Sequence, residues 1–224
     1  ALFVARDGQR AADIEAALEF YAPDLPVLSL PAWDCLPYDR VSPNADISAR
    51  RVQALAQLAA EQAAGGDGPT RLIVTTANAI LQRVPPRSAM QDQAFHLAQG
   101  NTVDMDALIR WLEDNGFMRV STVRDTGEYA VRGGILDLYP PGQDSPVRLD
   151  FFGDQLDTVR SFDAETQRTT RQVVRINLVP MSEVILSQDA IARFRTGYIS
   201  SFGAASPADT LYPGVSDGRR HPGM

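Results

Sequence analysis

The chain has 224 residues and a formal net charge of −7, and all 21 of its basic residues are Arg, because no Lys is present. A phosphate-binding loop of the G-x-x-x-x-G-K-[ST] type and a Schiff-base mechanism both need a Lys, so this chain can form neither. With a single Cys, Cys35, and two His, His96 and His221, a disulfide framework and a Cys/His zinc cluster are also excluded.

The distribution of apolar residues bears on location. No apolar stretch approaches the roughly 20 residues that cross a bilayer, and we expect a cytoplasmic protein. The first residues read as a buried strand with no Met or leader before it, and residues 212–224 read as a polar run without a closing element. We therefore expect the chain to be a piece of a longer protein.

Residues 1–93 alternate short apolar strands with helices. We expect strands at residues 2–5, 27–30 and 72–74, each followed by a helix whose first turn is capped by Asp7, by Asp46 or Ser48, and by Thr75 or Thr76. This alternation is typical of a parallel α/β sheet. A long loop, residues 31–43, follows the second strand, where loops often carry function, although its Trp33 and Tyr38 could simply pack the loop down.

From residue 94 the pattern changes to one helix and a series of strands separated by turns. The helix is expected at residues 104–115. The antiparallel strands are expected at residues 117–123, 129–132, 135–139, 147–152, 156–162 and 173–178. A further helix, capped by Ser187 or Asp189, begins the last stretch. We predict α/β plus α+β: a parallel α/β domain at residues 1–93, a small antiparallel-sheet α+β domain at 94–180 and a returning segment at 181–224.

The strand at residues 147–152 has two chemically different faces. A period of two places the apolar positions 147, 149 and 151 on a core face, and Arg148, Asp150 and Phe152 on the other. An aromatic residue beside an Arg is typical of an anchor in a protein interface. A helix that covers Phe152 as part of a second core would produce the same pattern, and spacing alone leaves both readings open.

Arg132 precedes Gly133 and Gly134, where the absence of side chains lets another backbone come close. Arg132 alone is typical of a solvated surface Arg. With Arg148 on a neighbouring strand, it could instead form a cationic patch that binds carboxylates of a partner protein, since the planar guanidinium of Arg forms bidentate hydrogen bonds with carboxylates. Residues 94–180 contain nine Arg against thirteen Asp and Glu, a difference of −4. This balance argues against a broad phosphate-binding face.

Metal and catalytic sites have little support in the residue spacing. Five carboxylates are numerous enough to hold a divalent ion but lack the spacing of an EF-hand: Asp137, Asp150, Asp154, Asp157 and Asp163. His221 follows two Arg in the terminal tail, which is a poor place for a Ser/His catalytic pair. We expect no catalytic residue, metal or cofactor in this chain.

Several motifs carry a resemblance to a known family. They are W-D-x-L-P-Y-D at residues 33–39 with Ser42-Pro43, E-Y-A-x-R-G-G-I-L-D-L-Y-P at 128–140, R-L-D-F-F-G-D at 148–154, S-F-D at 161–163 and Q-R at 167–168. In this order they resemble the N-terminal region of the bacterial transcription-repair coupling factor family (Mfd). The second and third motifs also resemble the excision-repair helicase subunit UvrB, whereas the loop at residues 33–39 points to Mfd.

The resemblance implies a fold and a partner. In that family a RecA-like half domain, without a working nucleotide-binding motif, is interrupted by a small α+β domain that docks UvrA, the damage-recognition subunit, and then resumes. Carried over by position, the family's UvrA contacts fall on Arg132, Arg148 and Phe152. The resemblance further implies a full-length ATP- and Mg²⁺-dependent DNA translocase that displaces stalled RNA polymerase from double-stranded DNA, with a motor outside this segment.

The expected function is therefore that of a protein-docking module, without catalysis of its own, in transcription-coupled nucleotide excision repair. One alternative is a residual DNA- or nucleotide-binding domain of the UvrB type, against which the missing Lys and the acidic balance count. Another is an intramolecular clamp, in which C-terminal domains of the same parent chain cover the docking surface and hold the parent inactive.

Overall fold

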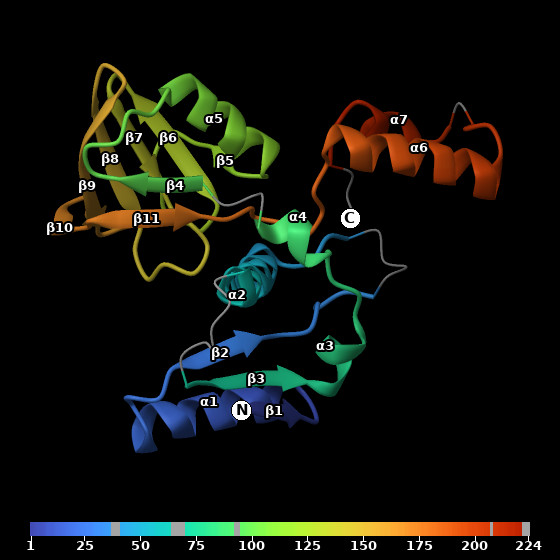
Figure 1. The fold of residues 1–224 in the computed structure, drawn as a ribbon, viewed down its shortest axis with the longest axis horizontal. Helices are drawn as coiled ribbons and strands as arrows, with labels where there is room; N and C mark the ends of the chain where they lie inside the picture. Colours follow the sequence, from blue (N-terminus) through green and yellow to red (C-terminus); the bar gives the residue numbers. More distant parts are fainter. Residues whose placement is uncertain (37–40, 64–69, 92–94, 207, 221–224) are drawn as a thin grey trace. The chain divides into compact units, whose positions relative to one another are not determined.

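A computed structural model describes residues 1–36, 41–63, 70–91, 95–206 and 208–220 (Figure 1). The chain divides into two compact units: residues 1–33 with 45–183, and residues 34–44 with 184–224. The three-part division at residues 93 and 180 remains a prediction. Part of the predicted W-D-x-L-P-Y-D loop, including Tyr38, lies outside the described residues, as does His221.

The N-terminal part of the first unit is built on a parallel sheet, as predicted. Its strands β1 (Leu2–Ala5), β2 (Val27–Leu30) and β3 (Leu72–Thr76) are ordered β1-β3-β2. Helix α1 (Gly8–Tyr21) packs on β1 and β3, and α2 (Ala45–Ala63) packs on β2. Two shorter helices, α3 (Ala77–Leu81) and α4 (Arg87–Gln91), follow β3.

The predicted helix caps of this part are confirmed at two positions. The Asp7 carboxylate accepts a hydrogen bond from the backbone N–H of Arg10 at 2.9 Å, and the Thr76 hydroxyl accepts one from the N–H of Ala79 at 3.2 Å. Each satisfies a backbone donor that the first turn of a helix leaves without a partner. Helix α2 instead begins at Ala45, one residue before the earlier of its two candidate caps.

A six-stranded sheet follows, in the order β10-β9-β8-β7-β6-β5. Its strands are β5 (Met118–Arg119), β6 (Glu128–Arg132), β7 (Ile135–Leu138), β8 (Val147–Phe152), β9 (Gln155–Phe162) and β10 (Thr169–Gln172). Helix α5 (Met105–Asp114) buries Leu108 and Leu112 in the core that this sheet shares with it. The mixed α/β and α+β fold class is therefore confirmed.

Two details of the predicted strands are wrong. The segment expected as one strand at residues 117–123 pairs only at Met118 and Arg119, and it runs parallel to β6 rather than antiparallel. The strand expected at residues 173–178 begins at Arg175, and this strand, β11 (Arg175–Leu178), does not join the large sheet.

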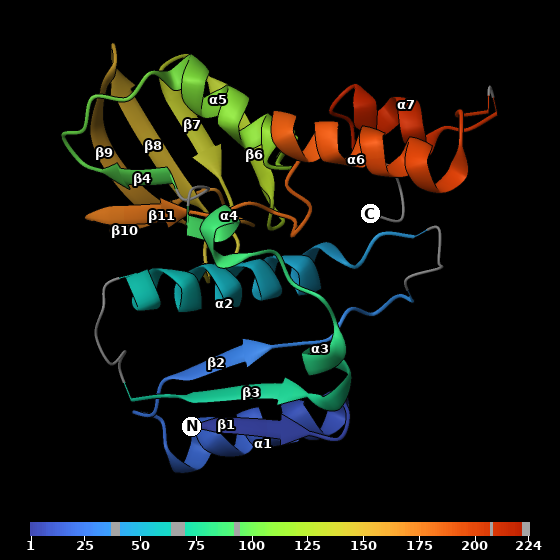
Figure 2. The same cartoon turned by 45° about the vertical axis from the view of Figure 1, so that its right-hand side comes forward.

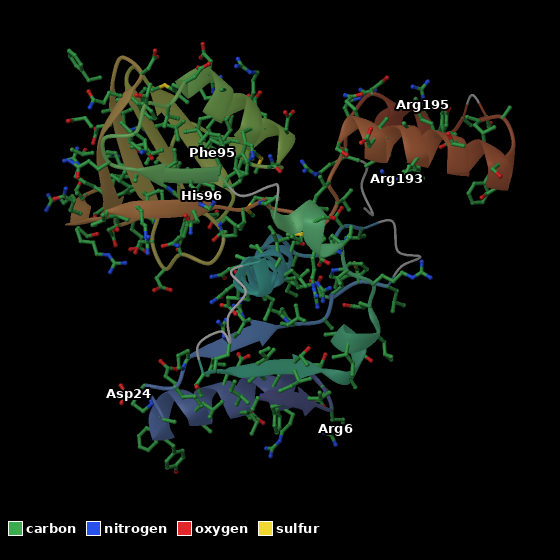
Figure 3. The ribbon with its side chains drawn as sticks, viewed as in Figure 1. Arg6, Asp24, Phe95, His96, Arg193 and Arg195 are labelled. Atoms are coloured by element: carbon green, nitrogen blue, oxygen red, sulfur yellow. The ribbon has the colours of Figure 1, made fainter. Side chains whose placement is uncertain are left out.

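Strand β11 pairs with β4 (Phe95–Ala98), a strand that sequence reasoning missed. The two lie side by side in both ribbon views (Figures 1 and 2). Phe95 and His96 are labelled on β4 in Figure 3. The Phe95 ring lies 5.7 Å from that of Trp111 on α5, and His96 Nδ1 lies 2.8 Å from Asn177 Oδ1 on β11. Because its partner is distant in the chain, β4 has no local turn signal.

The second unit contains α6 (Gln188–Phe202) and α7 (Leu211–Ser216). Of the two predicted cap candidates, Ser187 and Asp189, it is Ser187 that caps α6, by accepting a hydrogen bond from the N–H of Ala190 at 3.2 Å. Helix α7 was not predicted, because residues 212–224 read as a polar run without a closing element. Pro213 lies in the first turn of this helix, where Pro loses no hydrogen bond. The rings of Tyr198 and Tyr212 pack 5.0 Å apart between these helices. Among the helices of the described residues, none is long and apolar enough to cross a membrane.

Candidate functional site

The six-stranded sheet has an inner face toward α5 and an opposite face, which we call the outer face. The inner face carries buried apolar side chains: Tyr129, Leu136, Leu138, Val147, Leu149 and Val159. Because side chains alternate along a strand, the residues between them point outward. Strand register then defines two rows across the outer face: Ala130, Asp137, Arg148 and Arg160, and beside it Arg132, Ile135, Asp150 and Thr158.

One end of the outer face is covered by a small second core. Val123, Ala130 and Phe162 are each at most 2% exposed and form its buried cluster. The Arg148 guanidinium lies over the Phe162 ring, 4.9 Å from its centroid, in a cation–π contact. The outer face is therefore partly a packed surface and partly an open one, with Arg148 at the boundary between them.

Arg148 is held by a carboxylate on the neighbouring strand. Its Nε and Nη2 donate to the two oxygens of Asp137 at 2.7 and 2.8 Å. The Arg148 side chain is 18% exposed and that of Asp137 only 2%. The hydrogen bond with Asp137 raises the pKa of the Arg148 guanidinium above its usual value. This effect is larger than that of burial, which lowers the pKa.

A second ion pair lies next to the first. Asp150 accepts hydrogen bonds from Arg160 Nη2 at 2.5 Å and from the Thr158 hydroxyl at 2.6 Å. Burial raises the pKa of the Asp150 carboxyl, but the bonds from Thr158 and Arg160 outweigh it, so the pKa is lowered overall. Asp150 is therefore a carboxylate at neutral pH, and its charge is balanced by that of Arg160.

Arg132 differs from these two arginines in having no acidic partner among the described residues. Its Nη2 donates to the carbonyl oxygen of Ser121 at 2.6 Å and to the Thr122 hydroxyl at 3.3 Å, and the side chain is exposed. The sequence prediction placed Arg148 on a neighbouring strand, which is wrong: Arg132 is on β6 and Arg148 on β8, with β7 between them.

The close backbone approach predicted at the two glycines is confirmed. The carbonyl oxygen of Gly134 accepts from the N–H of Phe151 at 2.8 Å, and a Cβ added to Gly134 would lie 2.8 Å from the Phe151 carbonyl oxygen. Gly133 has a φ of 60°, a region that favours glycine. The backbone that comes close is thus β8 of the same chain, and the turn places Arg132 near the end of that strand.

Phe152 is the last residue of β8 and is 83% exposed. The reading in which a helix covers it as part of a second core is therefore wrong. Ile135, in the same row as Arg132, is 37% exposed. Arg132, Arg148 and Phe152 all belong to the outer face, and the open part of this face combines an exposed aromatic ring with an Arg that lacks an acidic partner.

Sequence reasoning placed Asp150 on the outward face of its strand, but it considered Asp137 only as a possible metal ligand and recognised neither carboxylate as the partner of an Arg. In the described part of the chain, no group of three or more His, Cys, Asp or Glu is placed to hold a metal ion. A useful signal was present in the motif itself, since Asp137 and Arg148 occupy outward positions of strands that are consecutive in the chain.

Comparison with known proteins supplies a family. A protein-family model described as the UvrB interaction domain matches residues 95–184, which include Arg132, Arg148 and Phe152. Among curated proteins, the transcription-repair-coupling factor of Escherichia coli K12 is 35% identical over 217 residues, 97% of this chain and 18% of that protein.

Two other relatives of the same name agree. The protein of Haemophilus influenzae is 35% identical over 193 residues, 86% of this chain and 16% of that protein. The protein of Myxococcus xanthus is 39% identical over 169 residues, 75% of this chain and 13% of that protein. The chain spans less than a fifth of the length of these relatives. It is homologous, over most of its own length, to the N-terminal region of transcription-repair-coupling factors, and it contains their UvrB interaction domain.

Proposed function

We propose that the outer face docks UvrA and that Arg132, Arg148 and Phe152 carry the contact. The chain would then act as the UvrA-recruiting module of a transcription-coupled nucleotide excision repair factor in the bacterial cytoplasm. In this proposal the whole protein is an ATP-dependent DNA translocase that displaces stalled RNA polymerase. ATP, Mg²⁺ and DNA belong to other domains of that protein, and this chain has no catalysis or cofactor of its own.

The exposure of Phe152 is the observation that supports this proposal most. An aromatic side chain that is 83% exposed gains most of its burial free energy only when a partner covers it. Ile135 adds apolar surface, and Arg132 adds a positive charge that no acidic side chain of the described residues balances. A partner surface with an apolar depression and a nearby carboxylate complements this arrangement.

The test is binding of the 224-residue chain to purified UvrA. We expect Arg132→Ala with Arg148→Ala, and separately Phe152→Ala, to weaken binding by about 2 to 4 kcal/mol, which is the usual range for a buried charged or aromatic anchor. Arg219→Ala is a matched control, because Arg219 is an exposed Arg of the second unit paired with Asp217. Circular dichroism checks the fold. Unchanged affinity in both variants would contradict the proposal.

The same exposed surface supports a second partner, the C-terminal part of the longer protein. An exposed apolar patch is a candidate for contact within a protein as much as between proteins. If such a clamp exists, the separated C-terminal part binds this chain, competes with UvrA and loses affinity with the Phe152→Ala variant. No binding between the two parts would remove the clamp and leave UvrA docking as it stands.

A further inference from the structure

The pair of Arg148 and Asp137 is unusual for a docking surface because its acidic member is almost fully buried. Asp137 stands directly opposite Arg148 in the register of β7 and β8, and its side chain is 2% exposed. Both of its oxygens accept from the same guanidinium, at 2.7 and 2.8 Å. A buried carboxylate is tolerated only when it is paired and hydrogen-bonded. Asp137 therefore depends on Arg148, and Arg148 is fixed in turn.

The geometry determines which edge of the guanidinium a partner can reach. Asp137 occupies the edge formed by Nε and Nη2, and the Phe162 ring lies against the guanidinium at 4.9 Å. The edge that includes Nη1 is left for a partner. An Arg held in this way loses little rotamer freedom on binding, which lowers the entropic cost of the contact.

The charges of the row determine what kind of group that edge prefers. Arg148 stands beside Arg160 in the register of β8 and β9, while Asp137 and Asp150 neutralise these two arginines. A partner carboxylate at Arg148 would add a second negative charge next to Asp137, although both arginines of this row are already paired with a carboxylate. A neutral oxygen, such as a backbone carbonyl or an amide, fits without this repulsion.

We propose that Asp137 is a positioning residue of the docking surface, which orients and neutralises Arg148 so that its Nη1 edge donates to a neutral oxygen of the partner. Arg132 then is the residue that meets a partner carboxylate. This inference rests on the proposed docking of UvrA, and it assigns different chemistry to two arginines that the sequence treats alike.

The first test is the variant Asp137→Asn, which keeps the size of the side chain but removes its charge and one acceptor. We expect UvrA affinity to fall at least about tenfold, a change of about 1.4 kcal/mol. Glu61→Gln is the matched control, since Glu61 pairs with the largely buried Arg71 in the parallel α/β part of the chain. It should lower the stability of the fold, measured by urea denaturation, without changing UvrA affinity.

A double-mutant cycle separates positioning from a general loss of stability. If Asp137 acts through Arg148, Asp137→Asn causes no further loss of UvrA affinity in a chain that already carries Arg148→Ala. Arg148→Ala alone leaves Asp137 buried without its partner, which can destabilise the fold. A double variant serves as the folded reference, because Asp137→Leu with Arg148→Met replaces both charges by apolar groups of similar size. It should bind as weakly as Arg148→Ala.

The salt dependence of binding distinguishes the two arginines. The Arg132→Ala variant should show a flatter dependence of UvrA affinity on salt than the unmodified chain. The double variant Asp137→Leu with Arg148→Met, which lacks the neutralised pair, should instead bind UvrA more weakly by a similar factor at every salt concentration. Two results would overturn the role of Asp137 and leave the docking surface intact. One is that the losses of UvrA affinity in the double-mutant cycle are additive. The other is that Asp137→Asn binds UvrA normally while Arg132→Ala and Phe152→Ala still bind it weakly. If Arg132→Ala and Phe152→Ala bind normally, the docking surface itself is wrong and the role of Asp137 falls with it.

Discussion

Single residues show how much the environment changes the chemistry of a side chain. Tyr129 is fully buried in the core between the six-stranded sheet and α5, and its hydroxyl donates to Glu113 Oε1 at 2.8 Å. Burial, and then the hydrogen bond to Glu113, raise the pKa of the Tyr129 hydroxyl from its usual value of 10.0 to about 12. The neutral phenol is therefore favoured by the folded state more than by the unfolded state.

This shift predicts a specific loss of stability in alkali. The contribution is fully present below pH 10, where the unfolded chain also keeps its proton, and it is lost as the pH rises from about 10 to about 12. Tyr129→Phe removes this dependence, so the difference in unfolding free energy between the two proteins should shrink over that range by up to about 3 kcal/mol. Urea denaturation at several pH values measures it, and parallel curves above pH 10 would contradict the assignment.

At the scale of elements, one buried side chain of α2 joins segments that are distant in the chain. Arg51 is fully buried; its guanidinium forms an ion pair with Glu183 and donates to the Pro31 carbonyl oxygen at 2.6 Å. It also lies 5.1 Å from the ring centroid of Trp33, whose indole N–H donates to the same Glu183 at 2.9 Å. The start of the long loop and the end of the α+β segment are thus held at one helix.

Removing this arginine should be costly, because a buried carboxylate would lose its partner. We expect Arg51→Ala to lower the free energy of unfolding by about 3 to 5 kcal/mol. The adjacent Arg50, whose side chain is 56% exposed and paired with Asp46, is the matched control, and Arg50→Ala should cost less than about 0.5 kcal/mol. Urea denaturation followed by Trp fluorescence reports both. Equal effects of the two substitutions would show that the Glu183 contacts contribute little.

The long loop also illustrates what local sequence can and cannot predict. The sequence predicts its position after β2. It leaves open whether the loop carries function or whether Trp33 simply packs it against the rest of the protein. The observed contacts with Arg51 and Glu183 support the packing reading for Trp33, while Tyr38 lies outside the described residues. Neither partner could be named from the sequence, since Arg51 looks like any other Arg of an amphipathic helix and Glu183 is 132 residues from it.

At the scale of the whole molecule, charge sets the expected behaviour toward nucleic acid. The net charge is −7 with no Lys, and the Arg residues near the candidate surface are partly neutralised by Asp137 and Asp150. We expect the chain neither to bind double-stranded DNA at about 0.15 M salt nor to hydrolyse ATP, because DNA affinity comes mainly from cationic contacts with phosphates. A gel-shift titration and a phosphate-release assay test this. DNA binding that weakens steeply with salt would favour the UvrB-type alternative.

The sequence by itself determined the features that depend on neighbouring residues. Alternating polarity predicted the extent of β8 and placed Arg148 and Phe152 on one face. Candidate caps marked the starts of three helices to within two residues: Asp7, Thr75 or Thr76, and Ser187 or Asp189. These features are local, because strand period and helix capping act over a few residues. The resemblance could therefore be recognised from short motifs before any contact was known.

Only the tertiary structure decided which side chains meet. It paired β4 with β11, placed Asp137 opposite Arg148, and left Phe152 exposed where a second core had been equally possible. These outcomes depend on strand register and on packing between segments far apart in the chain, which no local pattern encodes. For the same reason, the two arginines of the candidate surface look equivalent in the sequence and differ in the structure, where one has a buried carboxylate partner and the other has none among the described residues.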